Sequence, residues 1–477
     1  MHVSFKSRAI TTSPIIQNYI FHSIATNAGW FIDNEGSNSS IQFQFGGEKT
    51  VKFEKRAENK YNCYLSEQVL RDFLQFLKCE DSLNPEQEPQ ANPLPVLDER
   101  VAEIKGEIVN FCVNNQLPGI FKSLWPGGKN LAISITHDID ITRKYGLNAL
   151  ARDFFNADFG ALKDHYQKSV FRENIYWNFE ELLKLYREKN IIATMFFICK
   201  PWEKFHYRYN IRKSKYRKLF EAVSSDNHEI GLHTSRFAFD HPNRIRREKK
   251  KLEDVLGREV KGVRQHYLRL LYPKAWEYFE TNNFLYDSSC GYNDSPGFRA
   301  GTSLPFQTFD FEREQHHNLY EIPFSLMDYP WKERRDNGSD MKDIFRKITE
   351  PIEKTSGFLN LIWHPHNIVE EEFKELWQYL LTYVEKKDAY KTSLGNIIDW
   401  WEKRSGVQLR QFAYQSQSLD IRLNNQFSVK NICMEIISPK ELDTREGLQK
   451  KDRFLYLLTL PELSAGDHSI RLTLKSN

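Results

Sequence analysis

Short apolar runs alternate with amphipathic stretches through the middle of the chain. Two amphipathic stretches have helical spacing, 179–189, which Asn178 could cap, and 243–256, which ends at Gly257. Strands that alternate with helices favour a parallel sheet, and seven of them predict an α/β fold with an incomplete barrel. The seven expected strands are Leu131–Thr136, Ile192–Ile198, Glu229–Leu232, Val260–Val263, Phe284–Asp287, Leu319–Pro323 and Phe358–Trp363.

The pattern before this region is different. Residues 41–45 and 51–54 alternate apolar and polar side chains around Gly46-Gly47, which is a hairpin signal. A helical pattern follows Ser66. These features predict an α+β domain over residues 1–80.

Two further changes of pattern divide the rest of the chain. Residues 81–97 are rich in proline and polar residues and are typical of a linker. A leading helix and the barrel are expected over 98–404. Strand-like runs separated by turn residues predict a small all-β domain over 405–477.

Composition narrows the class of protein. The chain has 477 residues, of which 40% are hydrophobic and 14% aromatic, enough for a sizeable core. Its 67 basic and 64 acidic residues nearly balance, so no charge excess points to nucleic acid or to an anionic membrane. No apolar run is long enough for a membrane span or a signal peptide. The six scattered cysteines are expected to be reduced, which favours a cytoplasmic protein, or a secreted one if a leader has been removed.

Polar side chains collect where the expected strands end. Asp138 and Asp140 follow the first strand, His233 follows the third, and Arg264 and His364 follow later strands. The carboxyl ends of barrel strands meet at one face, where active sites of such folds lie. Asp138 and Asp140 are two residues apart and point to the same side of an extended backbone, where a cation would offset their repulsion. A carboxylate with His233 therefore predicts a site for a divalent metal, zinc first.

Several of these segments resemble the polysaccharide deacetylase family, which has the NodB homology domain and is grouped with carbohydrate esterase family 4. The similar segments are Thr136-His-Asp-Ile-Asp140, Ala193-Thr-Met-Phe-Phe197, His228-Glu-Ile-Gly-Leu-His-Thr234 and Gly262-Val-Arg-Gln-His-Tyr267. Phrases after Tyr286, Gly297 and Glu321 resemble a diverged bacterial branch with an amino-terminal extension. The resemblance covers about 131–404 and implies a distorted seven-stranded (β/α) barrel.

The resemblance also implies roles for single residues. Asp138 matches the catalytic base, Arg264 the arginine that orients it, and Tyr267 the residue whose backbone N–H holds the oxyanion. His364 matches the general acid. Asp140 and His233 match two metal ligands. Further candidates for substrate binding are Asp287, Arg299, Glu321 and His366. No organic cofactor is expected.

One family feature is missing. The second metal histidine is normally four or five residues after the first, where this chain has Phe237 and Ala238. His266 replaces a proline of the arginine motif and is our first choice for the third ligand, with Asp240 and His241 as rivals. His241 precedes Pro242 at a helix start, which capping alone explains.

The expected function is metal-dependent hydrolysis of an acetyl group, N-acetyl before O-acetyl, on a bacterial surface polysaccharide or its precursor. The expected partner is thus a carbohydrate, and no nucleic acid or membrane span is expected. Two alternatives remain: an amidohydrolase for a small non-sugar C–N bond, and an inactive homologue that binds glycans or acts as a scaffold. The β-rich segment after residue 405 is a structural cap, an oligomerisation element or a glycan-binding module.

Overall fold

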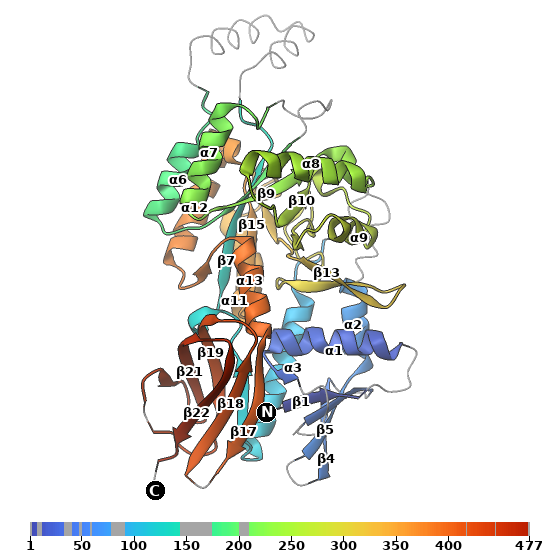
Figure 1. The fold of residues 1–477 in the computed structure, drawn as a ribbon, viewed down its shortest axis with the longest axis vertical. Helices are drawn as coiled ribbons and strands as arrows, with labels where there is room; N and C mark the ends of the chain where they lie inside the picture. Colours follow the sequence, from blue (N-terminus) through green and yellow to red (C-terminus); the bar gives the residue numbers. More distant parts are fainter. Residues whose placement is uncertain are drawn as a thin grey trace, which may run out of the picture.

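The fold is seen in a computed structural model that describes residues 2–6, 12–32, 41–46, 50–57, 60–77, 91–143, 174–199, 209–415, 417–443 and 445–475. Most of the expected linker, up to residue 90, lies outside these ranges. Figure 1 shows the sheet and its helices in the upper part of the molecule, with the amino-terminal and carboxy-terminal parts side by side below. No helix in the described ranges is both long and apolar enough to cross a bilayer.

The central sheet is mixed and contains ten strands. All seven expected strands belong to it, together with β12, β14 and the short β16. Adjacent strands of this sheet are parallel, except that β12 and β13 are antiparallel. The first and last strands in the spatial order, β12 and β14, do not pair with each other among the described residues. In spatial order the strands are β12 (Phe306–Asp310), β13 (Gln315–Glu321), β11 (Tyr286–Asp287), β10 (Gly262–Gln265), β9 (Glu229–Thr234), β8 (Thr194–Ile198), β7 (Ala132–Ile139), β15 (Phe358–Ile362) and β14 (Leu326–Met327), with β16 (Tyr390–Lys391) on β7.

Burial explains why the middle strands are so apolar. Every residue of β7, β8 and β15 is buried, as expected for parallel strands covered on both faces. The helices that follow the strands are α6 (Phe179–Glu188), α7 (Ser214–Ser225), α8 (Pro242–Leu256), α9 (Lys274–Thr281), α10 (Asp328–Asp336), α11 (Met341–Lys354), α12 (Glu371–Lys386) and α13 (Leu394–Ser405). Helix α8 ends at Gly257, whose φ of 69° is the left-handed conformation of a C-cap. Asn178 does not cap α6 with its side chain.

The amino-terminal part is a five-stranded sheet in the order β2-β1-β3-β5-β4 with three helices. The hairpin expected around Gly46-Gly47 is wrong, because β5 lies between β3 and β4. Only two residues separate β4 from β5, so these two strands form the hairpin instead. The elements are β1 (His2–Phe5), α1 (Pro14–Ala28), β2 (Phe31–Ile32), β3 (Ile41–Phe45), β4 (Val51–Ala57), β5 (Lys60–Leu65), α2 (Glu67–Leu77) and α3 (Val96–Asn114).

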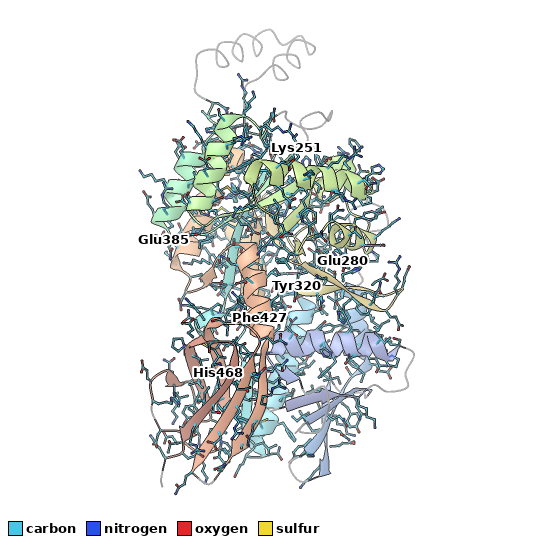
Figure 2. All side chains as sticks on the ribbon, in the orientation of Figure 1. Lys251, Glu280, Tyr320, Glu385, Phe427 and His468 are labelled. Carbon is cyan, nitrogen blue, oxygen red and sulfur yellow. The ribbon has the colours of Figure 1, made fainter. Side chains whose placement is uncertain are left out.

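Two antiparallel sheets form the carboxy-terminal part. One has the order β17-β18-β22, and the other β20-β21-β19-β6. Strand β6 (Gly119–Lys122) precedes the strands of the central sheet in the sequence, yet it pairs with β19. Figure 2 labels Phe427 and His468 on this part of the molecule. The other strands are β17 (Val407–Tyr414), β18 (Ser418–Asn425), β19 (Val429–Ile437), β20 (Leu448–Lys450), β21 (Leu455–Leu463) and β22 (Gly466–Thr473).

Candidate metal and catalytic centre

Four strands of the central sheet bring the candidate residues together. Asp138 and Asp140 lie at the carboxyl end of β7, and His233 lies near the end of β9. His266 follows β10 directly, and His364 comes two residues after the end of β15. Strands β15, β7, β8, β9 and β10 are adjacent in this order and parallel, so their carboxyl ends lie together at the same end of the sheet.

Three side chains converge on one point. Asp140 Oδ1 is 3.3 Å from His233 Nε2, and Asp140 Oδ2 is 3.4 Å from His266 Nε2. One ligand atom from each of Asp140, His233 and His266 lies within 4.8 Å of the others. A carboxylate with two imidazoles is a donor set that suits a divalent transition metal. Asp140 Oδ1 is buried without a hydrogen bond of good geometry among the described residues, which also fits a cation.

The surroundings orient the first histidine. His233 Nδ1 lies 2.9 Å from the backbone oxygen of Arg264, to which it donates when it carries the proton, and this turns Nε2 towards Asp140, as outer contacts of metal ligands do. Burial would lower the pKa of His233, but the carboxylates of Asp138 and Asp140 outweigh it and raise the pKa. Burial would likewise raise the pKa of Asp140, but His266, His233 and His364 hold it well below its usual value. The surrounding imidazoles thus favour the ionised form of the Asp140 carboxylate.

Asp138 is held by a buried arginine. Arg264 Nη1 donates to Asp138 Oδ1 at 2.9 Å and to Thr136 Oγ1 at 2.7 Å. Its other nitrogens donate to the backbone oxygen and hydroxyl of Ser288, so the guanidinium is fixed. Burial would raise the pKa of Asp138, but Arg264 and then His233 lower it. The carboxylate is therefore ionised at neutral pH and can accept a proton, with Oδ2 3.7 Å from His233 Nε2.

His364 has its own carboxylate partner, Asp328. His364 donates to Asp328 through Nδ1 and through its backbone N–H, both at 2.8 Å. Asn367 donates to the same carboxylate at 2.9 Å. Burial would lower the pKa of His364, but Asp328 and Asp140 raise it well above its usual value. The Asp328 carboxylate thus favours the charged form of this imidazole, whose Nε2 lies 3.5 Å from Asp140 Oδ2.

The remaining candidates lie in different places. Tyr267 is 46% exposed and has a positive φ of 58° just after β10, at the edge of the centre. His366 is buried beside His364, and Tyr329 Oη lies 3.1 Å from its Nε2. Burial first, and then the charge on His364, lowers the pKa of His366 to about 4. The rival metal ligand His241 is 58% exposed and contacts Asp240, outside the converging group.

Three expected substrate contacts have little or no exposed surface. Asp287 and Glu321 are fully buried. Ser289 and Trp276 donate hydrogen bonds to them, and burial raises the pKa of both carboxyl groups. Arg299 is 8% exposed and donates to the backbone oxygen of Gly291. Asp287 and Glu321 thus lie in the packed interior, and contact of these three side chains with a substrate stays a prediction.

Sequence reasoning missed Asp328, Ser288 and Thr136. Asp328 follows β14, a two-residue strand that was too short to be recognised. The signal was present, because an aspartate ends the apolar stretch 322–327. Thr136 begins the segment Thr136-His-Asp-Ile-Asp140, and Ser288 directly follows Asp287. A single hydroxyl residue has no sequence pattern that would mark it as a partner of Arg264.

Comparisons with known proteins complete the description. No family model and no curated protein matches the chain. A proposed polysaccharide deacetylase from Mycobacterium smegmatis is 17% identical, with a TM-score of 0.39, over 58% of this chain and 91% of that one. The allantoinase PuuE is 14% identical with a TM-score of 0.39, over 59% and 93%. A CE4 family pseudoenzyme from Bacillus anthracis is 10% identical with a TM-score of 0.30, over 57% and 66%. At these identities and TM-scores the likeness carries no argument about function, which is therefore argued from the residues of the centre.

Proposed function

We propose that the protein is a metal-dependent carbohydrate deacetylase that removes N-acetyl groups from a bacterial polysaccharide or its precursor. The observation that carries the proposal is the convergence of Asp140, His233 and His266 between two charged pairs, Asp138–Arg264 and His364–Asp328. One pair provides an ionised carboxylate and the other a protonated imidazole. Amide hydrolysis needs both, a group that accepts a proton and a group that donates one.

Asp140, His233 and His266 would hold the metal, for which zinc is our choice. A bound divalent cation lowers the pKa of water and polarises a carbonyl oxygen. The assignment of His266 supplies the ligand that Phe237 and Ala238 cannot. It comes from the neighbouring strand β10 rather than from the turn after β9.

The protein's own groups would divide the proton transfers. Asp138, kept ionised by Arg264, accepts a proton from the attacking water. His364, kept protonated by Asp328, gives a proton to the leaving amine. The backbone N–H of Tyr267 is assigned to the oxyanion, since a positive φ turns the chain at this edge of the centre.

Metal content of three proteins tests the ligand set. The wild type should retain about one zinc per chain, His266→Ala should lose it, and His241→Ala is the matched control that should keep it. Loss in the His241 variant alone would reverse the assignment, and loss in neither would leave Asp140 and His233 with a different third ligand.

Acetate release tests the reaction. The proposal expects acetate from N-acetylated chitooligosaccharides or polysaccharide and no turnover of small non-sugar amides. Turnover of the small amides alone would make the protein an amidohydrolase of another kind. Tight metal binding and glycan binding without acetate release would make it a non-catalytic homologue.

A further inference from the structure

A group of positive charges lies on the side of the sheet that holds the candidate centre. Residues 209–218 lead into α7 and begin it, and they contain no carboxylate but five cationic side chains, Arg212, Lys213, Lys215, Arg217 and Lys218. Because α7 follows the carboxyl end of β8, its first turns lie at the same end of the sheet as the centre. Helix α8 packs against α7 (Figure 1), and neither helix has an acidic residue in its first turn. The whole chain has a net charge of only +3, so this accumulation is local.

A hydrogen bond joins this group to the segment that carries the metal ligand Asp140. Thr142 is two residues after Asp140, and its hydroxyl forms a 2.7 Å hydrogen bond with the hydroxyl of Tyr216, the residue after Lys215. Arg143 is exposed and comes three residues after Asp140. Three residues of extended chain span at most about 11 Å, so Arg143 begins the cationic group close to the centre.

Lys215 is held among other cations by an aromatic ring. Its ammonium lies 3.8 Å from the ring centroid of Trp177 and 5.2 Å from that of Tyr216, which are cation–π distances. Burial lowers the pKa of Lys215 most, and the charges of Lys213 and Arg143 lower it further. These three side chains, from the segment after β7 and from the start of α7, are therefore close enough to repel one another.

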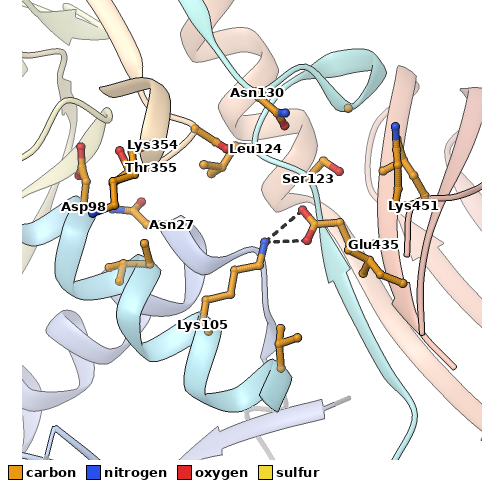
Figure 3. Close-up of a pocket in the computed structure, with 18 of the residues that line it drawn as sticks. Asn27, Asp98, Lys105, Ser123, Leu124, Asn130, Lys354, Thr355, Glu435 and Lys451 are labelled. Atoms are coloured by element: carbon orange, nitrogen blue, oxygen red, sulfur yellow. Dashed lines mark hydrogen bonds and ion pairs between the residues drawn. The ribbon is translucent and has the colours of Figure 1, made fainter. Parts of the chain in front are cut away.

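No carboxylate neutralises these cations. In the part of the chain that the structure describes, none of Arg143, Arg212, Lys213 and Lys215 has a carboxylate within ion-pair distance. The contrast is Lys105, on the far side of the molecule, which forms an ion pair with Glu435 at 2.9 Å, as Figure 3 shows. Like charges that are held together without a counter-charge attract an anionic partner.

The group extends to α8. Lys251, labelled in Figure 2, donates a hydrogen bond to the backbone oxygen of Cys199 at the end of β8. Burial lowers the pKa of Lys251 most, and the nearby guanidinium of Arg212 lowers it further. The positive charge thus continues from the segment after β7 across α7 to α8, which suits an extended anion better than a single small one.

We propose that the substrate polysaccharide is acidic, and that Arg143, Lys213 and Lys215 bind carboxylate or phosphate groups on sugars next to the one that reacts. The inference rests on the proposed function, because it takes the centre as the place where the polymer reacts. A polymer that extends from the centre over Arg143 reaches Lys215 next. An anionic membrane would meet the same charges but would bring no acetyl group to the centre, so an acidic glycan is the partner that fits both features.

Three probes of equal length test the preference for charge. Hyaluronan oligosaccharides alternate N-acetylglucosamine with a carboxylated sugar, an oligomer of N-acetylglucosamine 1-phosphate carries phosphodiesters, and chitin oligosaccharides are neutral. At low salt, calorimetry should give at least one acidic probe a Kd about tenfold or more below that of the neutral probe. The difference should shrink at about 1 M salt, where exposed charges are screened within about 3 Å. The acidic probe that binds more tightly identifies the anionic group.

Matched variants locate the binding. Arg143→Gln/Lys213→Gln/Lys215→Gln should weaken the Kd of the preferred acidic probe by about tenfold or more and change that of the chitin oligosaccharide by less than about twofold. The control Arg71→Gln/Lys52→Gln/Lys430→Gln removes one exposed arginine and two exposed lysines from the amino-terminal and carboxy-terminal parts, and it should bind like the wild type. The melting temperature of the first variant should stay within about 2 °C of that of the wild type, which excludes unfolding as the cause.

Acetate release separates this inference from the proposed function. Equal binding of acidic and neutral probes, equal binding of the acidic probe by the first variant and the wild type, or binding to phosphatidylglycerol vesicles but to neither acidic glycan would overturn the inference, even where chitin oligosaccharides release acetate. Binding of an acidic glycan that depends on the three cations, without acetate release from any probe, would instead refute the proposed function and leave the acidic glycan as a bound partner.

Discussion

Replacing Asp328 with asparagine removes a negative charge that is fully buried beside His364. The carboxylate accepts four hydrogen bonds, two from His364, one from Asn367 and one from the backbone N–H of Tyr329. An amide has only one acceptor oxygen, so it cannot serve all four donors, and its NH₂ group would face at least one of them. A hydrogen bond to a charged group contributes about 1.5–3 kcal/mol, and breaking a buried charged pair costs about 3–5 kcal/mol. We therefore expect Asp328→Asn to lower the free energy of unfolding by about 2–4 kcal/mol.

Two measurements check this. Denaturant unfolding at neutral pH gives the loss of stability, with Asp240→Asn as the control, because Asp240 is 41% exposed and its charge should matter little. An NMR titration should show that the pKa of His364 falls in Asp328→Asn, since the charge that raises it is gone. A stability loss below about 1 kcal/mol together with an unchanged pKa of His364 would refute the argument that Asp328 holds this imidazole protonated.

Three further predictions concern other parts of the structure. Asp138→Asn should keep the metal, measured by elemental analysis, but lose about 10²–10⁴ in acetate release. Burial raises the pKa of Asp98 to about 6; its protonated form therefore favours the folded state, and the stability difference between wild type and Asp98→Asn should fall by about 3 kcal/mol as pH rises from about 4 to 7. Gly262→Ala should cost about 1–3 kcal/mol or more, because its Cβ would lie 2.1 Å from Tyr286 Cζ. Gly106→Ala, in helix α3 with open space around it, is the matched change and should add about 0.5–1 kcal/mol.

Local pattern identified the buried central strands and the amphipathic helices. Strand β8 was expected at Ile192–Ile198 and is found at Thr194–Ile198, and α8 differs from its expected range by one residue. Such elements have continuous apolar runs or clear helical spacing that no other structure explains. The short strands β14 and β16 have two residues each, which gives no period to detect.

Pairing between distant strands was less predictable. Strands β3 and β5 have similar alternating patterns, so the hydrophobic pattern alone allows β4 to pair with either of them. In the structure β4 pairs with β5, which gives the order β3-β5-β4. The centre shows the same limit. Asp138, Asp140 and His233 stand in recognisable motifs, whereas Asp328 becomes a partner of His364 only because β14 and β15 are neighbours.

Strand β6 has a consequence for how the molecule is made. It is synthesised before the central sheet, but its partner β19 follows about three hundred residues later, with Lys122 opposite Met434. During translation its edge stays open until nearly the whole chain has left the ribosome, and open strand edges invite wrong partners. A gene cut near residue 405 would therefore not release two independent products. The fragment before the cut would contain β6 without its partner β19, and the fragment after it would contain a sheet that lacks its edge strand β6.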